Sequence, residues 1–506
     1  MLLLNSLSLY FLPLLFFILF LHKFFSKTTH KNLPPSPLKL PLLGNLHQLG
    51  RFPHRSLRSL AKKYGPLMLL HFGNVPVLVV SSAVAAREIL KTHDLAFLSR
   101  PKLSIASRLL YDLKDATFCP YGEHWRQVRS ICVLHLLSNK RVQSYRKVRE
   151  EETALMMDKI RSHSCSSSSL VNLTDVFVSL TYGIVCRVAL GRKYDGAGGG
   201  TRFKELLGRV VGLIGVSNVG DYIPWLAWIN GVSGLDAKVD KVAKEMDEFL
   251  KGVVEERFNR NKGHDDGGSS RSFLDVLLEI QRDDVGGCSA VRNDTVKALI
   301  VNMFVAGTDT TFTALEWTMM ELLRHPQIMK KLQNEVRDIA RGKLNVTEDD
   351  LDKMHYLKAV VKESFRLHTP APLLIPRESI QDVHIMGYDI AAGTEVLINA
   401  WAIGRDPLSW EDPEEMRPDR FLNSSIDFKG QDFELIPFGG GRRGCPGTPF
   451  AANVNELALA NVLHRFDFSS PEGECSEDMD VSEISSITIR KKTPYCGCNF
   501  LLLLVS

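Results

Sequence analysis

The sequence lacks a strong excess of either charge, and it lacks the cysteine pattern of a disulfide-stapled domain. Its 62 Lys and Arg residues against 58 Asp and Glu residues leave a net charge of +4 over 506 residues, which is too small to indicate nucleic-acid binding. The nine cysteines are odd in number and irregularly spaced. We therefore expect a reduced, cytosol-facing protein that does not bind nucleic acid.

The first 21 residues, MLLLNSLSLYFLPLLFFILFL, contain no charge at all, and Lys23, Lys27 and Lys31 follow them. About 20 apolar residues span a bilayer as a helix. A cleaved signal peptide, the alternative, carries its positive charge before the apolar run. Because the charge comes afterwards here, the positive-inside rule places the rest of the chain in the cytosol. We expect a single-pass transmembrane signal anchor over residues 1–22.

The remaining chain shows no internal repeat and no second folded unit. Residues 23–45 are basic and proline-rich, which predicts a stiff, extended linker. Residues 67–82 read as two strands around a turn at Gly73 and Asn74. From 83 to about 370 the pattern is mostly helical, with polar breaks at 162–169, 196–200 and 263–270, and short strands return after 376. The sequence predicts one globular domain over 46–506, mainly α with minor β.

One cysteine lies in the glycine-rich, basic stretch PFGGGRRGCPG, residues 437–447. Glycines allow backbone N–H groups to approach a sulfur closely, and Arg442 and Arg443 are expected to favour the thiolate of Cys445. A helix beginning after Pro446 would direct its positive end at the sulfur. A single thiolate suits one axial ligand of a haem iron better than a zinc site or an iron–sulfur cluster. An inert cysteine in a glycine-rich turn and a phosphate-binding loop remain alternatives.

The residues of this stretch also carry a family resemblance. Phe438, Gly441, Arg443, Cys445 and Gly447 match the Phe-x-x-Gly-x-Arg-x-Cys-x-Gly signature of cytochrome P-450 enzymes position for position. The resemblance implies the cytochrome P-450 fold, haem b (iron protoporphyrin IX) bound through Cys445 as the axial iron ligand and contacted by Phe438, and a haem-thiolate monooxygenase activity.

The stretch FVAGTDTT, residues 304–311, lies in an apolar helical run. Met303, Ala306, Gly307 and Thr310 fall on one helix face, and the small residues leave room for a flat group. Asp309 and Thr310 offer a carboxylate and a hydroxyl suited to proton relay, and Gly307 lets the backbone open locally. A buried helix whose threonine hydroxyls bond back to carbonyls is the alternative. The run resembles the oxygen-activating helix of the family, which implies that Ala306 contacts the haem and that Asp309 and Thr310 are catalytic.

Two pairs of residues, each on one face of a predicted helix, suggest an anion-binding site and an ion pair. Trp125 and Arg129, at i and i+4, present an indole N–H and a guanidinium that can bind a carboxylate. The resemblance assigns both to the haem propionates, together with Arg377 and Arg443. Glu363 and Arg366, at i and i+3, read by default as a surface salt bridge.

In the family, this second pair forms a triad with an arginine of a later loop. The resemblance assigns that position to Arg420 and implies a structural role, in which the triad locks the loop that carries Cys445.

Between Arg126 and Arg149 the sequence has seven basic residues and no acid. A solvated helix face is the ordinary explanation for such a run. The resemblance implies that this region docks an acidic partner, the NADPH-dependent cytochrome reductase.

Several longer stretches, including LPPSPLKLPLLGN, KESFRLHTPAPLLIPRES and NAWAIGRDPLSWEDPEEMRPDRF, resemble plant microsomal enzymes, and especially the large plant family numbered 71. This implies an endoplasmic reticulum membrane protein that uses O2 to oxidise a small lipophilic metabolite: a terpenoid, indole alkaloid, coumarin or phenylpropanoid. A haem-dependent aldoxime dehydratase or lyase, and a non-catalytic haem carrier, are the alternatives. The tail 493–506 departs from the family pattern.

We expect mostly apolar residues to line the substrate pocket. The predicted lining comprises the segments 103–118, 213–225 and 484–487, the helix from Met303 to Thr310 with Ala306, and the residues Ala371, Leu373, Leu374 and Ile375.

Overall fold

The computed structural model describes residues 32–164, 171–194, 200–260, 271–283, 291–468, 482–484, 486–492 and 503–504. The predicted anchor at 1–22 lies outside the described residues, as do most of the three polar breaks and nearly all of the tail.

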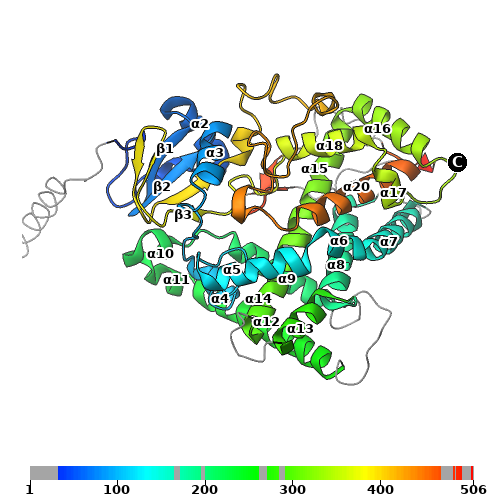
Figure 1. Ribbon diagram of the computed structural model, residues 1–506, viewed down its shortest axis with the longest axis horizontal. Coiled ribbons are helices and arrows are strands. Elements are labelled where there is room, and N and C mark those ends of the chain that lie inside the picture. Colours follow the sequence, from blue (N-terminus) through cyan, green and yellow to red (C-terminus); the bar gives the residue numbers. More distant parts are fainter. Residues whose placement is uncertain are drawn as a thin grey trace, which may run out of the picture.

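Helices make up most of the described chain (Figure 1). The longer ones are α2 (Pro53–Tyr64), α5 (Glu123–Ile131), α7 (Arg146–Ser164), α8 (Leu173–Leu190), α9 (Gly200–Ile214), α12 (Leu235–Arg260), α13 (Phe273–Asp283), α14 (Asn293–Phe304), α15 (Thr310–Arg324), α16 (Pro326–Ile339), α18 (His355–Leu367) and α20 (Thr448–Arg465). The shorter ones are α3 (Ala83–Arg87), α4 (Ser104–Leu109), α6 (Asn139–Ser144), α10 (Val219–Tyr222), α11 (Trp228–Val232), α17 (Glu348–Leu351) and α19 (Ala400–Ile403).

A small sheet lies at one end of the molecule beside α2, and the long helices fill the other end (Figure 1). Its strand order is β1 (Leu67–Phe72), β2 (Val75–Val80), β6 (Glu395–Ile398) and β3 (Arg377–Glu378). Strands β1 and β2 pair antiparallel across the predicted turn, where Gly73 has a φ of 57°, a conformation that favours glycine. Strand β2 pairs parallel with β6, and β3 pairs antiparallel with β6. The predicted mainly α fold with a minor β part is confirmed.

Three two-stranded ladders complete the β structure of the described residues. They are β4 (Val383–Ile385) with β5 (Tyr388–Ile390), β7 (Phe466–Asp467) with β10 (Leu503–Leu504), and β8 (Glu483–Ile484) with β9 (Arg490–Lys491).

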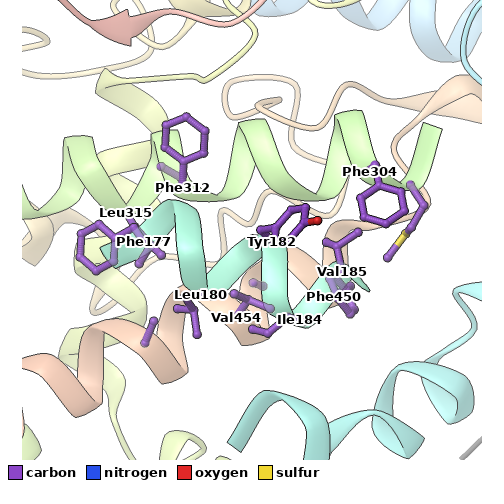
Figure 2. Close-up of a cluster of buried hydrophobic side chains, with 14 of the residues drawn as sticks. Phe177, Leu180, Tyr182, Ile184, Val185, Phe304, Phe312, Leu315, Phe450 and Val454 are labelled. Atoms are coloured by element: carbon purple, nitrogen blue, oxygen red, sulfur yellow. The ribbon is translucent and has the colours of Figure 1, made fainter. Parts of the chain in front are cut away.

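The helical core is built around α8. This helix begins where the Asn172 side chain accepts a hydrogen bond from the N–H of Asp175, and it ends at Gly191 with a φ of 77°. Between these caps the helix is apolar on nearly every face, as expected of a helix buried on all sides. Figure 2 shows its side chains, among them Phe177, packed between those of α14, α15 and α20.

Two helical stretches of the described residues are long and apolar enough to cross a membrane, Leu173–Leu190 and Asn293–Arg324. Their most apolar windows are 72% and 67% buried inside the protein. Packing in the core therefore accounts for their apolar character.

The proline-rich segment contacts the sheet. The carbonyl of Pro35 accepts a hydrogen bond from the N–H of Leu69 at 2.9 Å, and the Asn45 side chain accepts one from the N–H of His71 at 2.8 Å. Residues 35–45 thus lie along β1 and hold the start of the domain against the sheet.

Replacing Phe177, which is fully buried, should test this core. We expect Phe177→Ala to lower the free energy of unfolding by about 3–5 kcal/mol, because the ring is lost and a cavity remains. Urea denaturation followed by circular dichroism measures the change. The exposed control Val133→Ala should stay within about 0.5 kcal/mol of the wild type, and an equal loss in both variants would contradict the packing described.

Candidate active site

The Cys445 loop folds as a tight turn that only glycine permits. Gly441 has a φ of 65°, and a Cβ on it would lie 2.2 Å from the carbonyl oxygen of Leu90. The loop closes when the N–H of Cys445 donates to the carbonyl of Phe438 at 2.9 Å, and α20 begins three residues later at Thr448. The loop therefore presents one sulfur at the start of a long helix.

The sulfur of Cys445 borders an internal cavity of about 290 Å³. The side chain is accessible from this cavity and enclosed by protein elsewhere. Burial raises the pKa of the thiol, while the N–H of Gly447 and the guanidinium of Arg129 lower it. The prediction that Arg442 and Arg443 supply the positive charge at the sulfur is thus wrong. Arg442 pairs instead with Asp94 at 3.1 Å, and the Arg443 side chain extends to other partners.

The cavity also borders a cluster of buried positive charge. Four guanidiniums and two carboxylates interact in it: Arg100, Arg129, Arg377 and Arg443, with Asp94 and Asp115. The exposed Arg442 pairs with Asp94 from outside this cluster. Burial lowers the pKa of Arg443 to about 9, and its Nη1 is buried without a hydrogen-bond partner. Burial also lowers the pKa of Arg100, and the neighbouring arginines lower it further.

This cluster and Cys445 fit a haem. Without the exposed Arg442, four positive and two negative charges leave two positive charges beside the cavity, and buried charge is costly unless it is paired. Two propionates would supply two negative charges, and the charge of a thiolate would be offset by the iron it binds. Among the described residues no group of three or more His, Cys, Asp or Glu side chains could hold a metal ion. Iron bound to the sulfur would also offset the burial that disfavours the thiolate.

Two arginines of the cluster are tied to the loops around them. Arg377 donates to Asp94 at 3.0 Å and to the carbonyl of Gly440 at 2.7 Å, which links β3 to the cysteine loop. Arg100 lines the cavity and donates to the carbonyl of Pro376 at 2.7 Å. Sequence reasoning missed Arg100. A lone arginine directly after the apolar run LAFLS was the one signal available.

The structure corrects the role predicted for Trp125. Its indole N–H donates to the carbonyl of Ala116 at 3.2 Å, and the residue does not line the cavity. The ring instead lies 3.9 Å from the guanidinium of Arg443, a cation–π contact. Trp125 therefore packs on an arginine of the cluster, whereas Arg129, Arg377 and Arg443 themselves line the cavity.

The helix at the cavity opens where it was expected to. Val305–Asp309 forms a π-helical turn, η5, between α14 and α15. Met303, Ala306, Gly307 and Thr310 all line the cavity. The hydroxyl of Thr310 donates to the carbonyl of Ala306 at 2.6 Å, so the back-bonded arrangement considered as the alternative is also present. Asp309 borders the same cavity, and its carboxylate accepts hydrogen bonds from Thr488 and Arg490.

The apolar wall of the cavity agrees with the predicted segments only in part. Ala371, Leu374 and Ile375 line it, but Leu373 packs against the core between α2 and the sheet. The reason is a turn, closed by the Leu374 N–H and the Ala371 carbonyl at 3.0 Å, so that neighbouring side chains do not share a face. The other predicted segments contribute fewer residues than expected: 116–118, Ile214 and Ile487, with Thr488 added.

Glu363, Arg366 and Arg420 come together in the interior, where sequence spacing alone had suggested a surface pair. Arg366 donates to Glu363 at 2.7 and 2.8 Å, and Arg420 donates to it at 3.1 Å. Both Glu363 and Arg366 are fully buried, and Arg366 also donates to the carbonyls of Gly404, Pro413 and Glu415. One turn of α18 thus fixes the loop from 404 to 420.

The basic run from Arg126 to Arg149 is less exposed than its sequence suggests. Arg149 is fully buried and donates to Glu348 at 2.5 Å, and Arg146 is paired with Asp349. Arg129 lines the cavity. Arg126 and Lys140 are exposed, so the surface charge available to a partner is smaller than the run of seven implies.

Removing the charge of Glu363 should destabilise the protein strongly. Glu363→Gln leaves Arg366 buried with carbonyl partners only, and we expect a loss of about 3–5 kcal/mol in the free energy of unfolding. The matched control is Glu411→Gln, an exposed acid that pairs with Arg417 at 3.5 Å, which should change stability by less than about 1 kcal/mol. Urea denaturation of both variants decides, and similar stability in the two would contradict a bracing role.

Comparison of this chain with known proteins identifies its family. The family model described as Cytochrome P450 matches residues 34–496. A protein named Cytochrome P450 736A117 from Prunus mume is 56% identical, over 97% of this chain and 96% of its own length. Norfluorocurarine oxidase from a Strychnos species is 53% identical, over 97% and 98%. A zebrafish cytochrome P450 structure with abiraterone superposes with a TM-score of 0.75 at 25% identity, over 90% of this chain and 99% of that one. The chain belongs to the cytochrome P450 family of haem b monooxygenases.

Proposed function

We propose that this protein oxidises a small, neutral, lipophilic plant metabolite, an indole alkaloid, terpenoid, coumarin or phenylpropanoid. The observation that carries the proposal is one cavity that brings together Cys445, Asp309, Thr310 and an apolar wall. The similarity to norfluorocurarine oxidase supports a substrate from plant specialised metabolism.

The residues around the cavity have separable tasks. Bound haem supplies the chemistry of oxygen activation, with Cys445 as its thiolate ligand. Arg100, Arg129, Arg377 and Arg443, which line the cavity, would hold its propionates through charge-assisted hydrogen bonds and so fix the orientation of the group.

Asp309 and Thr310 handle protons. The hydroxyl of Thr310 donates to the Ala306 carbonyl in the π-helical turn, and rotation of the side chain would turn it to a group in the cavity that Thr310 lines. The Asp309 carboxylate takes up a proton from solvent and passes it to the hydroxyl oxygen of Thr310, which releases its own proton to a group in the cavity.

The apolar side chains that line the cavity select the substrate. Met303, Ala371, Leu374, Ile375 and Ile487 present hydrocarbon surface, which favours a substrate held by contact area. Among the described lining residues, the charged groups are the haem-binding arginines and Asp309, which is already paired. A substrate with its own strong charge would have no free counterion there.

The apolar composition of residues 1–22 and the exposed Arg126 and Lys140 support a proposed membrane setting. We place the protein in the endoplasmic reticulum membrane through a single span at residues 1–22, followed by a linker over 23–45, with the catalytic domain over 46–506 facing the cytosol. Electrons come from a reductase, as in the family, and the exposed Arg126 and Lys140 are the docking residues we assign to the NADPH-dependent enzyme.

The activity is tested with microsomes that contain the full chain and reductase, incubated with a panel of alkaloids, terpenoids, coumarins, phenylpropanoids and aldoximes. We expect one class to be oxidised, with product formation dependent on both NADPH and O2. Cys445→Ser should abolish turnover and the thiolate-type carbon monoxide spectrum, whereas Cys186→Ser, at a buried cysteine of α8, should keep both. Product formed without NADPH and O2 would establish a lyase, and a normal spectrum with no turnover of any class would indicate a carrier.

Docking is tested by charge reversal. Arg126→Glu and Lys140→Glu together should raise the KM for reductase about tenfold at low salt, with an effect that shrinks as ionic strength rises. The control Lys251→Glu, on an exposed face of α12, should leave this KM unchanged. A KM that is insensitive to the reversal and to salt would place the docking surface elsewhere.

A further inference from the structure

A buried carboxylate folds the turn at residues 115–119, which borders the cavity. Asp115 is fully buried, and its Oδ2 accepts hydrogen bonds from the N–H groups of Thr117 at 2.8 Å and Phe118 at 2.9 Å. Ala116, Thr117 and Phe118 line the cavity, whereas Asp115 lies behind them. Asp115 can therefore act on the cavity through this turn and through its charge.

The carbonyls of the turn accept hydrogen bonds from two of the arginines that line the cavity. The carbonyl of Thr117 accepts from Nε of Arg100 at 3.0 Å, and that of Cys119 accepts from Nη2 of Arg443 at 2.7 Å. The arginines belong to segments before and far after the turn in the chain. The shape of the turn therefore helps to fix where their guanidiniums lie.

The same turn is attached to α14. The side-chain oxygen of Asn302 accepts a hydrogen bond from the N–H of Ala116 at 3.0 Å and another from the hydroxyl of Thr117 at 3.3 Å. Asn302 also lines the cavity. The turn is thus held on one side by α14 and from within by Asp115.

Asp115 also contributes charge to the buried arginine cluster. Burial lowers the pKa values of Arg100 and Arg443, and the carboxylate of Asp115 opposes that fall in both. The second carboxylate of the cluster, Asp94, forms its ion pair with Arg377. Asp115 is therefore the carboxylate that interacts with Arg100 and Arg443.

The thiols that interact with Asp115 are neutral near pH 7. Burial raises the pKa of Cys119 to about 11 and that of Cys132 to about 12, and the charge of Asp115 contributes to both shifts. Burial raises the pKa of Asp115 as well, while the N–H groups of Phe118 and Thr117 oppose the rise. Nearby guanidiniums favour the ionised form of a carboxyl, so we treat Asp115 as the anion of this group.

We propose that Asp115 is a positioning residue of the haem site with two separable effects: its Oδ2 folds the turn whose carbonyls hold Arg100 and Arg443, and its buried negative charge lowers the reduction potential of the bound haem. The proposal rests on the propionate-binding role given above to these arginines.

Both effects follow from general physical chemistry. A fixed negative charge in a medium of low dielectric constant disfavours the electron that a haem iron takes up on reduction. A turn that loses its side-chain acceptor leaves two buried N–H groups unsatisfied, which is costly and loosens the arginines held by its carbonyls. Asparagine at position 115 separates the two effects, because its amide keeps an acceptor oxygen and lacks the charge.

The charge is tested by measuring the reduction potential of the full-length, substrate-free holoenzyme in a spectroelectrochemical titration. At the midpoint potential of the wild type, Asp115→Asn should raise the ratio of ferrous to ferric protein about fivefold, and Arg443→Gln should lower it by a similar factor. The matched control is Asp112→Asn, which removes the same charge from an exposed position of the same segment. Asp112 has a φ of 58°, which asparagine tolerates, and this variant should leave the ratio unchanged.

The turn is tested by the rate at which each ferric holoenzyme loses haem to an excess of apomyoglobin. Asp115→Ala, which has no acceptor for the two N–H groups, should lose haem about tenfold faster than the wild type. Asp115→Asn and Asp115→Ser, which keep an acceptor oxygen, should lose it at close to the wild-type rate. Arg443→Gln should also lose haem faster, because a propionate partner is gone.

The two measurements distinguish the parts of the proposal. An unchanged potential in Asp115→Asn, or an equal shift in Asp112→Asn, would overturn the charge effect even if Asp115→Ala does not fold. Equal haem loss in Asp115→Ala and Asp115→Asn would overturn the effect of the turn. Wild-type potential and haem retention in Arg443→Gln would instead overturn the propionate-binding role of that arginine, and the proposal for Asp115 would fall with it.

Discussion

The uncompensated positive charge beside the cavity is the constraint on which the site depends. Four guanidiniums meet two carboxylates there, and the lowered pKa of Arg443 and its unpartnered Nη1 reflect the cost of burying them. Such a cluster is tolerable when anions of the right number and spacing lie against it. The haem therefore completes a charge balance as well as supplying chemistry, and its binding is expected to stabilise the folded chain by mass action.

Hydrogen bonds and ion pairs hold the loops around this charged cluster in place. Arg377 joins β3 to the cysteine loop, and Glu363 and Arg366 join α18 to the loop around 404–420. Phe438 packs on Phe365 of the same helix, with ring centres 5.2 Å apart. One helix thus supports both the ion-paired loop and the loop that presents the sulfur.

The sequence could predict those parts of the site that depend on residues close together in the chain. The glycine turn before Cys445, the hairpin at Gly73 and the opened helix at Gly307 each follow from a few neighbouring residues. Arg100 and Arg490 act through contacts between distant segments, and no local pattern distinguishes them from ordinary charges. Trp125 and Leu373 were misassigned for a related reason: spacing gives the face of a helix or loop but not the partner that faces it.

The π-helical turn at Val305–Asp309 determines how this helix would respond to the loss of one residue. A π turn contains one residue more than the α-helix around it, and each residue of an α-helix advances the face by about 100°. Deleting any one residue of the turn would restore a regular helix while α15 keeps its register with α8 and α20. The fold would then survive, with Trp317 still facing Ile489, while the local opening of the backbone beside the cavity would close. Length variation within these five residues therefore separates the stability of the helix from the proton transfer proposed for it.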